Sequence, residues 1–377
     1  MTARPARPHR PPGRAARALT RALLALALLT PAALTTSCAP ASGGSTTLTV
    51  LASSELVDME PLLTDLKRET GITMALEFRG TVDASTEIGA RPGRYDLAWL
   101  ASDRWLRLDR KDSGTGTPLP PATRTMLSPL AIGLKPAAAE RLRHTGADTA
   151  ASWADIAADA AAGSLRYALA DPGATNSGLA ALVAVASAVT GTGRVLRPED
   201  VETDLLRGFL VGRTVTAPTT SRLIDAYVQQ QDRTDALIAY ESDLLVLNAG
   251  DRLREPLEIV YPRDGMVLSD YPLLLLDPAK RASYDRVVDW LLKPSTQERI
   301  MRQTLRRPVD PTLRRDPRLA HSIGNALYFP DQPQVVRRLL DHYTADTAGS
   351  PASAPRPTPD QPAHPVPNPV PNPSSNP

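Results

Sequence analysis

The sequence contains little of what a disulfide-stabilised or metal-binding protein requires. Among its 377 residues there is one cysteine, so no disulfide can form within the chain. The four histidines beyond the N-terminal segment are not spaced as metal-ligand pairs; they are His144, His321, His342 and His364. Aromatic residues make up 4% of the chain, which disfavours recognition by stacked rings. We therefore expect no metal and no cofactor.

Motifs that assemble a nucleophile or a phosphate cradle are also absent. The sequence has no Gly-x-Ser-x-Gly, no His-Glu-x-x-His and no Gly-x-x-x-x-Gly-Lys segment. A hydrolase needs a nucleophile beside a base, and no pattern in this chain indicates that pair. We expect a protein with no catalytic residues.

The N-terminal segment has the pattern of an export signal. Six arginines and no acid precede an apolar stretch over residues 22–34, which is shorter than the roughly 20 residues that span a bilayer. This pattern predicts a signal peptide over residues 1–37. The lone Cys38 follows at once, in a context that resembles the bacterial lipobox, although Leu34 stands four residues before it where that motif has leucine three before.

Two interpretations of Cys38 follow. In the first, Cys38 is lipidated, residues 38–45 form a linker, and the protein is held at the extracytoplasmic face of the cell membrane. In the second, an ordinary secretory signal is cut nearby and Cys38 is a free thiol.

The charge of the remaining chain argues against nucleic acid as a partner. The net charge of +2 includes six signal arginines, and removing them leaves 37 basic against 41 acidic side chains, a balance of −4. Residues 347–377 are rich in Ala, Pro, Ser and Asn, with a Pro-Val-Pro-Asn repeat over 365–373. That composition predicts a disordered tail.

Between these ends the apolar pattern alternates between strand and helix. Residues 48–51 form a short apolar run, leucines at helical spacing lie between Met59 and Leu66, and residues 72–78 alternate strictly. The same rhythm continues through the chain. Further strands are expected at 95–100, 127–134, 165–170, 211–217, 235–240, 257–261 and 271–276. Capping boxes are expected at Ser152…Asp155 and Ser295…Glu298. This order predicts an α/β fold that begins with parallel strands.

Six segments in this order resemble a known family. They are Leu48-Thr-Val-Leu-Ala-Ser-Ser, Tyr95-Asp-Leu-Ala-Trp-Leu-Ala-Ser-Asp, Ser128-Pro-Leu-Ala-Ile-Gly, Ser152-Trp-Ala-Asp-Ile, Leu169-Ala-Asp-Pro…Asn-Ser-Gly-Leu and Ala239-Tyr-Glu-Ser-Asp. Between Thr46 and Arg307 the chain resembles bacterial extracellular solute-binding proteins of the type II periplasmic-binding-protein fold, in particular the molybdate/sulfate-like group. The resemblance implies two lobes around a ligand cleft, with lobe 1 at 46–126 and 245–346 and lobe 2 at 127–244. It also implies that residues 128–134 and 240–244 cross between the lobes.

Ligands of such α/β proteins bind at the carboxyl ends of strands, which selects the candidate site residues. In lobe 1 these are Ser53, Ser54, Gly80, Thr81 and Ser85, where hydroxyls and helix N-termini suit an anionic or strongly polar group. A serine that only caps the following helix is the alternative interpretation of Ser53-Ser54. Arg79, beside them, either pairs an anionic ligand or is a charge at the strand end.

In lobe 2 the candidates are Ser128, Asn176, Ser177 and Tyr240. Asn176 or Ser177 is alternatively an N-cap, and Tyr240 alternatively a core side chain. Thr219-Thr220-Ser221 begins a further helix that faces the same region.

Three functions are consistent with these features. The resemblance favours a monomeric substrate receptor of an ABC-type importer that binds a small polar or anionic ligand between its lobes and docks on a permease. The second is an envelope sensor or scaffold lipoprotein that keeps the fold, contacts another envelope protein and has no transport role. The third, an enzyme, has no motif in its favour.

Overall fold

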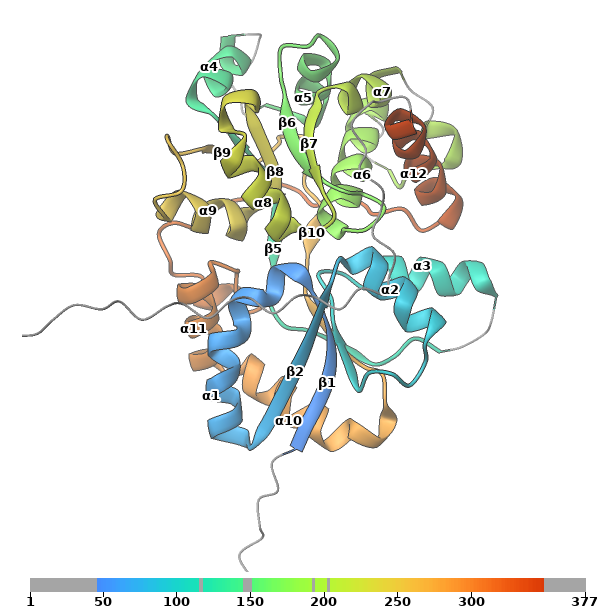
Figure 1. Ribbon diagram of the computed structural model, residues 1–377, viewed down its shortest axis with the longest axis vertical. Helices are drawn as coiled ribbons and strands as arrows, with labels where there is room; N and C mark the ends of the chain where they lie inside the picture. Colours follow the sequence, from blue (N-terminus) through green and yellow to red (C-terminus); the bar gives the residue numbers. More distant parts are fainter. Residues whose placement is uncertain (1–45, 115–117, 145–150, 192–193, 202–203, 349–377) are drawn as a thin grey trace, which may run out of the picture. The chain divides into compact units, whose positions relative to one another are not determined.

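The computed structural model describes residues 46–348 except 115–117, 145–150, 192–193 and 202–203. The expected signal peptide, Cys38, the linker and residues 349–377 of the expected tail lie outside these residues. Residues 347 and 348, where the tail was expected to begin, are the end of a helix instead. The described residues form two sheets with helices packed around each (Figure 1). None of the described helices is both long and apolar enough to cross a membrane.

The first sheet has five strands in the order β2-β1-β3-β11-β4. Their bounds are β2 Ile72–Arg79, β1 Thr46–Ser53, β3 Leu97–Trp99, β11 Pro272–Leu275 and β4 Ala122–Arg124. β1 pairs in parallel with β2 and β3, which confirms the predicted parallel start, while β11 is antiparallel to both of its neighbours. Because β1 lies between β2 and β3, the strand order reverses at β1. This is the place in an open α/β sheet where ligands bind.

Apolar spacing and glycine explain the first helix of this lobe. Leu62, Leu63 and Leu66 of α1 (Glu60–Thr70) are buried, as their spacing predicts. Gly71 ends the helix with φ 72°, a conformation that glycine adopts without steric cost, and its N–H donates to the carbonyl of Lys67 at 2.8 Å. The other helices of this half are α2 (Thr81–Ala90), α3 (Arg104–Ser113), α10 (Arg281–Leu292) and α11 (Pro294–Thr304).

The capping box predicted at Ser295 is wrong. α11 begins at Pro294 after Lys293, and no side chain caps it. Proline is favoured in the first turn of a helix because its missing N–H would have no helical partner there. Ser295 therefore lies inside the helix.

The second sheet has the order β10-β5-β8-β6-β7, and β9 pairs with β5 as well. Its strands are β10 Leu268–Ser269, β5 Ser128–Leu134, β8 Ala236–Tyr240, β6 Tyr167–Ala170, β7 Arg213–Ala217 and β9 Glu258–Val260. Its helices are α4 Pro136–His144, α5 Trp153–Ala161, α6 Asn176–Thr190, α7 Asp204–Val211, α8 Thr220–Gln229 and α9 Glu241–Ala249. The predicted capping box at Ser152 is confirmed, with reciprocal bonds of 3.0 and 2.9 Å to Asp155.

The sheet memberships differ from the expected lobe boundary at residue 245. β9 and β10 lie beyond that residue, yet both pair with β5 of the second sheet. The expected crossing at 240–244 comprises the last residue of β8 and the start of α9, which packs on β5 and β8. The chain returns to the first sheet later, between Ser269 of β10 and Pro272 of β11. Alternation of apolar residues locates strands, but it does not specify which sheet a short strand joins.

Helix α12 (Pro333–Ala348) contacts elements of both halves. Its Val336 lies in one apolar cluster with Val82 of α2, Leu108 of α3 and Leu179 of α6. Arg337 forms an ion pair with Asp112 of α3, while other residues of the helix pack on α6 and α7. α12 therefore connects both halves, whereas the expected boundaries place residues 245–346 in lobe 1 alone.

A buried ion pair fixes the region where the chain crosses between the sheets. The Arg307 guanidinium donates to both Glu241 oxygens at 2.6 Å, and the two side chains are 3% and 0% exposed. Arg307 also exchanges two 2.8 Å backbone bonds with Leu127, immediately before β5. Tyr261 donates to the same carboxylate at 2.5 Å. The first turn of α9 is thereby joined to the segment after α11.

Replacing Arg307 by Met is expected to lower the free energy of unfolding by about 3–5 kcal/mol, because Glu241 would remain as a buried charge without its partner. Urea denaturation measures the change. The control is Arg281→Met, which removes an exposed i,i+4 pair with Asp285 and should cost about 0.5 kcal/mol or less. Equal losses in the two variants would show that the buried pair does not fix this region.

Candidate functional site

The carboxyl end of β1 gathers three of the predicted residues. Ser53, the last residue of β1, is fully buried, and its Oγ lies 2.6 Å from Oγ1 of Thr81. The same Oγ accepts the N–H of Ala101, which follows β3, at 2.7 Å. Ser85 is on α2 and donates to the Thr81 carbonyl at 2.8 Å. Ser53 makes no side-chain cap for the following helix, so its hydroxyl connects the strand ends instead.

The second sheet places a matching polar group at the ends of β6 and β8. Asn176 Nδ2 donates to the hydroxyl of Tyr240 at 2.8 Å, and both residues are buried. Ser177 Oγ lies 3.3 Å from Oγ1 of Thr220, the first residue of α8. The N-cap of α6 is neither Asn176 nor Ser177 but Thr175, which accepts the N–H of Gly178 at 3.2 Å. Asn176 and Ser177 thus lie in the first turn, where their side chains are available for other contacts.

Ser128 lies apart from both groups. It opens β5, where its Oγ donates to Ser242 Oγ and accepts the Ser242 N–H, both at 3.2 Å. These bonds join the start of β5 to the first turn of α9. Within the described contacts Ser128 links two elements of the second lobe, and the structure does not bring it to Ser53 or Thr81.

The two halves meet directly at the N-terminus of α2. The backbone N–H groups of Val82 and Asp83 donate to the carbonyl of Ala174 at 2.9 and 3.3 Å. Gly80 permits this approach, because a Cβ at its position would lie 2.3 Å from that same oxygen. A second contact joins Ser221 of α8 to the carbonyl of Ser54 at 3.2 Å. The predicted residues Gly80 and Ser54 therefore lie where the lobes touch.

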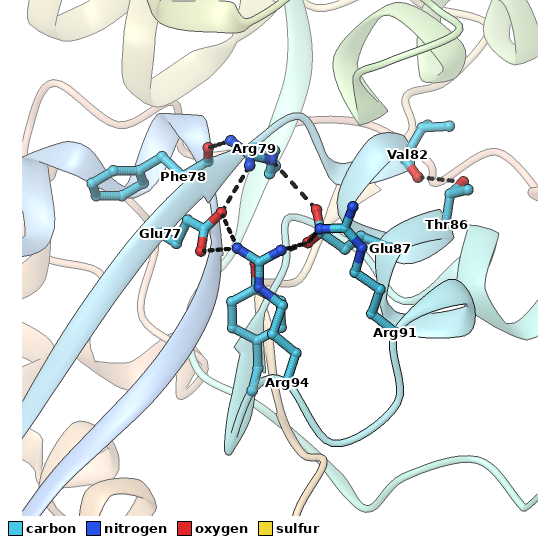
Figure 2. A network of polar contacts seen from close by, with 9 residues as sticks. Glu77, Phe78, Arg79, Val82, Thr86, Glu87, Arg91 and Arg94 are labelled. Carbon is cyan, nitrogen blue, oxygen red and sulfur yellow. Dashed lines mark hydrogen bonds and ion pairs between the residues drawn. The ribbon is translucent and has the colours of Figure 1, made fainter. Parts of the chain in front are cut away.

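Arg79 is held in an ion-pair network on the first lobe (Figure 2). Its guanidinium donates to Glu77 at 2.8 Å and lies 3.5 Å from Glu87. Arg94 bridges the same two carboxylates at 3.1 and 2.8 Å. Figure 2 shows both arginines directed at these acids, so Arg79 serves as a paired charge at the strand end.

The structure adds a partly buried charged cluster that the sequence did not predict. We call it the acidic cluster and define it as Glu55, Asp58, Asp243, Arg306 and Tyr271. Arg306 is fully buried and donates to both oxygens of Asp58 at 2.8 and 2.7 Å and to the Glu55 carbonyl at 2.7 Å. Its guanidinium lies 5.0 Å from the centre of the Tyr271 ring. Tyr271 in turn meets Tyr240 edge-on, with ring centres 6.1 Å apart, so the cluster adjoins the predicted site.

Burial dominates the electrostatics of Glu55 and Asp243. It raises the pKa of Glu55 above its ordinary value, against the lowering effect of Arg306. It raises the pKa of Asp243 to about 7, with Arg306 again opposing and Glu55 and Asp58 adding to the rise. Asp243 is partly exposed as a residue, but its Oδ2 is inaccessible and has no hydrogen-bond partner among the described residues. Perturbed carboxyls in such a position are typical of functional sites.

Tyr271 adopts an unusual backbone conformation. Its φ is 41°, in the left-handed region that bulky residues rarely occupy and that costs of order 1–3 kcal/mol. The structure buries Tyr271 completely, at the start of the strand expected over residues 271–276.

Part of the acidic cluster had a signal in the sequence. Glu55 directly follows Ser53-Ser54, and Asp243 ends the segment Ala239-Tyr-Glu-Ser-Asp. Arg306 had none, because it is 251 positions from Glu55 and reaches it only through the fold. In the described part of the chain no group of three His, Cys, Asp or Glu residues is placed to hold a metal ion.

Comparison with known proteins identifies the family. Residues 48–305 match the family described as bacterial extracellular solute-binding protein. The chain belongs to this family. Its members are binding proteins, so the expectations of a solute-binding fold and of no enzymatic activity are confirmed. A search of curated proteins finds no match.

Solved structures confirm the two-lobed fold of this binding protein. The periplasmic binding protein AfuA from Actinobacillus pleuropneumoniae, with exogenous fructose-6-phosphate bound, is 13% identical with a TM-score of 0.62 over 81% of this chain and 100% of AfuA. Iron-bound HitA from Pseudomonas aeruginosa is 15% identical, with a TM-score of 0.57 over 80% and 99%. The sulfate-binding protein SubI from Mycobacterium tuberculosis H37Rv is 14% identical, with a TM-score of 0.51 over 71% and 88%. At such identities the likeness establishes the fold and leaves the ligand open.

Replacing Asp243 by Asn is expected to change how stability depends on pH. The folded protein holds the Asp243 proton more tightly than the unfolded chain, whose ordinary pKa is 3.8, so the free energy of unfolding falls as pH rises from about 4 to about 7. Because Asn cannot titrate, the free energy of unfolding of the variant does not fall with pH for this reason. Relative to the wild type it should gain more than about 1 kcal/mol between pH 5 and pH 8, since one pKa unit corresponds to about 1.4 kcal/mol.

Urea denaturation at several pH values measures the difference, with Asp285→Asn on the exposed face of α10 as the matched control. Parallel pH curves for Asp243→Asn and the wild type would contradict the assigned burial of this carboxyl.

Proposed function

We propose that the protein is the substrate receptor of an ABC-type importer, anchored by lipid at Cys38 to the extracytoplasmic face of the membrane and binding a small polar ligand between its lobes. One observation carries the proposal. Buried polar side chains at the strand ends of both sheets, Ser53 and Thr81 on one side and Asn176 and Tyr240 on the other, lie beside the places where the lobes touch.

Family membership supports the transport part of this proposal. Extracellular solute-binding proteins supply ABC permeases. Among the related structures, AfuA has fructose-6-phosphate bound, HitA has iron bound, and SubI is a sulfate-binding protein. The spread of those ligands is consistent with a shared frame whose side chains select the solute. The anchor is proposed from the sequence, in which Cys38 follows the apolar segment of the signal.

The alternative is an envelope sensor or scaffold with the same fold and no transport role. The observation in its favour is α12, which packs against both halves through Val336 and Arg337 and would oppose their separation. A protein that never opens cannot exchange a solute, so ligand binding separates the two proposals.

The full chain, expressed with its own signal, is expected to incorporate a palmitate analogue, whereas Cys38→Ser is not. The Cys38→Ser protein then enters a thermal-shift screen against oxyanions, amino acids, amines, sugars and peptides. A ligand at about 100 times its dissociation constant should stabilise the folded state by about 2.7 kcal/mol.

Tyr240→Phe should weaken the ligand that registers, because it removes the hydroxyl that meets Asn176. Tyr227→Phe, buried in the core of the same lobe on α8, is the matched control and should leave affinity unchanged. Silence across the whole panel would reject the receptor proposal in favour of the scaffold, and equal labelling of both proteins would reject the anchor.

A further inference from the structure

The acidic cluster contains more acidic than basic side chains. Three carboxyl groups, those of Glu55, Asp58 and Asp243, face one guanidinium, that of Arg306. Glu55 and Asp58 belong to the short helix η1 (Ser54–Met59) after β1, and Asp243 lies in the first turn of α9. The acids therefore come from both lobes, and the cluster spans the region where the lobes meet.

Arg306 is already committed to one of these acids. It donates two hydrogen bonds to the Asp58 carboxylate and a third to the Glu55 backbone carbonyl. The Glu55 side chain has a contact of 3.2 Å with the Ser54 hydroxyl, and Asp243 Oδ2 is buried without a partner within the described structure. Two carboxyl groups thus lack a basic partner of their own. Buried acids in that position are costly unless a cation pairs with them.

A separate observation points to a missing ligand at the same place. The hydroxyl of Tyr271, a residue with no exposed surface, has no hydrogen-bond partner of good geometry among the described residues. This phenol lies within electrostatic range of Glu55, Asp243 and Arg306. Buried phenols almost always find a partner, so an unpaired one calls for an explanation.

We propose that the acidic cluster binds a primary ammonium group of the solute, with Glu55, Asp243 Oδ2 and the Tyr271 hydroxyl as its acceptors. The inference rests on the proposed receptor function and specifies its substrate class as an organic amine. Three N–H donors of an ammonium group match three acceptors that lack a strong partner. The ammonium would also join an acid of one lobe to an acid of the other and so favour closure of the lobes.

The groups that would suit an anion are occupied in this structure. The N-terminal N–H groups of α2 donate to the Ala174 carbonyl, and Ser53 and Thr81 bond one another. Arg79, the cation nearest to them in sequence, is paired with Glu77 and Glu87. Among the described residues of the acidic cluster, the buried atoms without partners are Asp243 Oδ2, the Tyr271 hydroxyl and the Nε of Arg306, which is a donor. Asp243 Oδ2 and the hydroxyl can both accept, and such acceptors suit a donor with positive charge.

Calorimetric titration of the Cys38→Ser protein with putrescine, ethanolamine and lysine tests the inference, alongside choline, sulfate, phosphate, glucose and calcium. At least one primary amine should bind, and choline should bind more weakly because its nitrogen carries no N–H. Asp243→Asn and Glu55→Gln should each weaken amine binding at least about tenfold, the loss expected when a hydrogen bond to a charged group is removed. Asp285→Asn, on the exposed face of α10, should bind as the wild type does.

The outcomes separate this inference from the receptor proposal. Binding of sulfate, phosphate, glucose or calcium without any amine would keep the receptor and overturn the amine inference. Amine binding that Asp243→Asn and Glu55→Gln leave unchanged would overturn the assignment to the acidic cluster. No binding by any compound would overturn both. Circular dichroism of each variant shows that it is folded before its affinity is compared.

Discussion

The close approach of Gly80 to the Ala174 carbonyl is the constraint on which the arrangement of the site depends. It brings the N-terminus of α2 against the loop before α6, so the carboxyl ends of β2 and β6 lie beside one another across the two lobes. A side chain at position 80 would meet backbone atoms, which cannot move aside as a flexible side chain can. The contact also satisfies donors that would otherwise be free for an anion. The neighbouring acids then determine which kind of ligand the groups between the lobes can bind.

The preference for one kind of ligand follows from where the fold places the acidic and basic side chains. The pair of Glu241 with Arg307 is balanced, buried and structural. One residue earlier, Arg306 points to Asp58 and the ring of Tyr271, while Glu55 and Asp243 remain without a basic partner in the described structure. Adjacent arginines thus have different roles: Arg307 joins the elements where the chain crosses, and Arg306 supports a cluster with more acidic than basic side chains. Mutual repulsion across the lobes would be relieved by a cation.

Much of the fold could be predicted from the sequence, because periodicity and caps are local. The strands near residues 48, 72, 128 and 236 and the Ser152 cap occur where their patterns indicate. The sheet membership of β9 and β10 could not be predicted, since it depends on pairing with β5 over long sequence distances. The candidate hydroxyls were found because they follow strands, but Arg306 was missed since no local pattern links it to Glu55.

The most direct test of the account is the distance between the lobes in solution. Spin labels at Ala137 of α4 and Ala282 of α10, both exposed, report this distance by pulsed electron resonance in the Cys38→Ser protein. Gly80→Ala is expected to add a population at a new distance, because the lobes cannot close over the added methyl. Gly89→Ala lies within α2, the helix that Gly80 precedes, and an added Cβ there would be 3.6 Å from its nearest neighbour, so this variant should reproduce the wild-type distribution. Identical distributions for Gly80→Ala and Gly89→Ala would contradict the account.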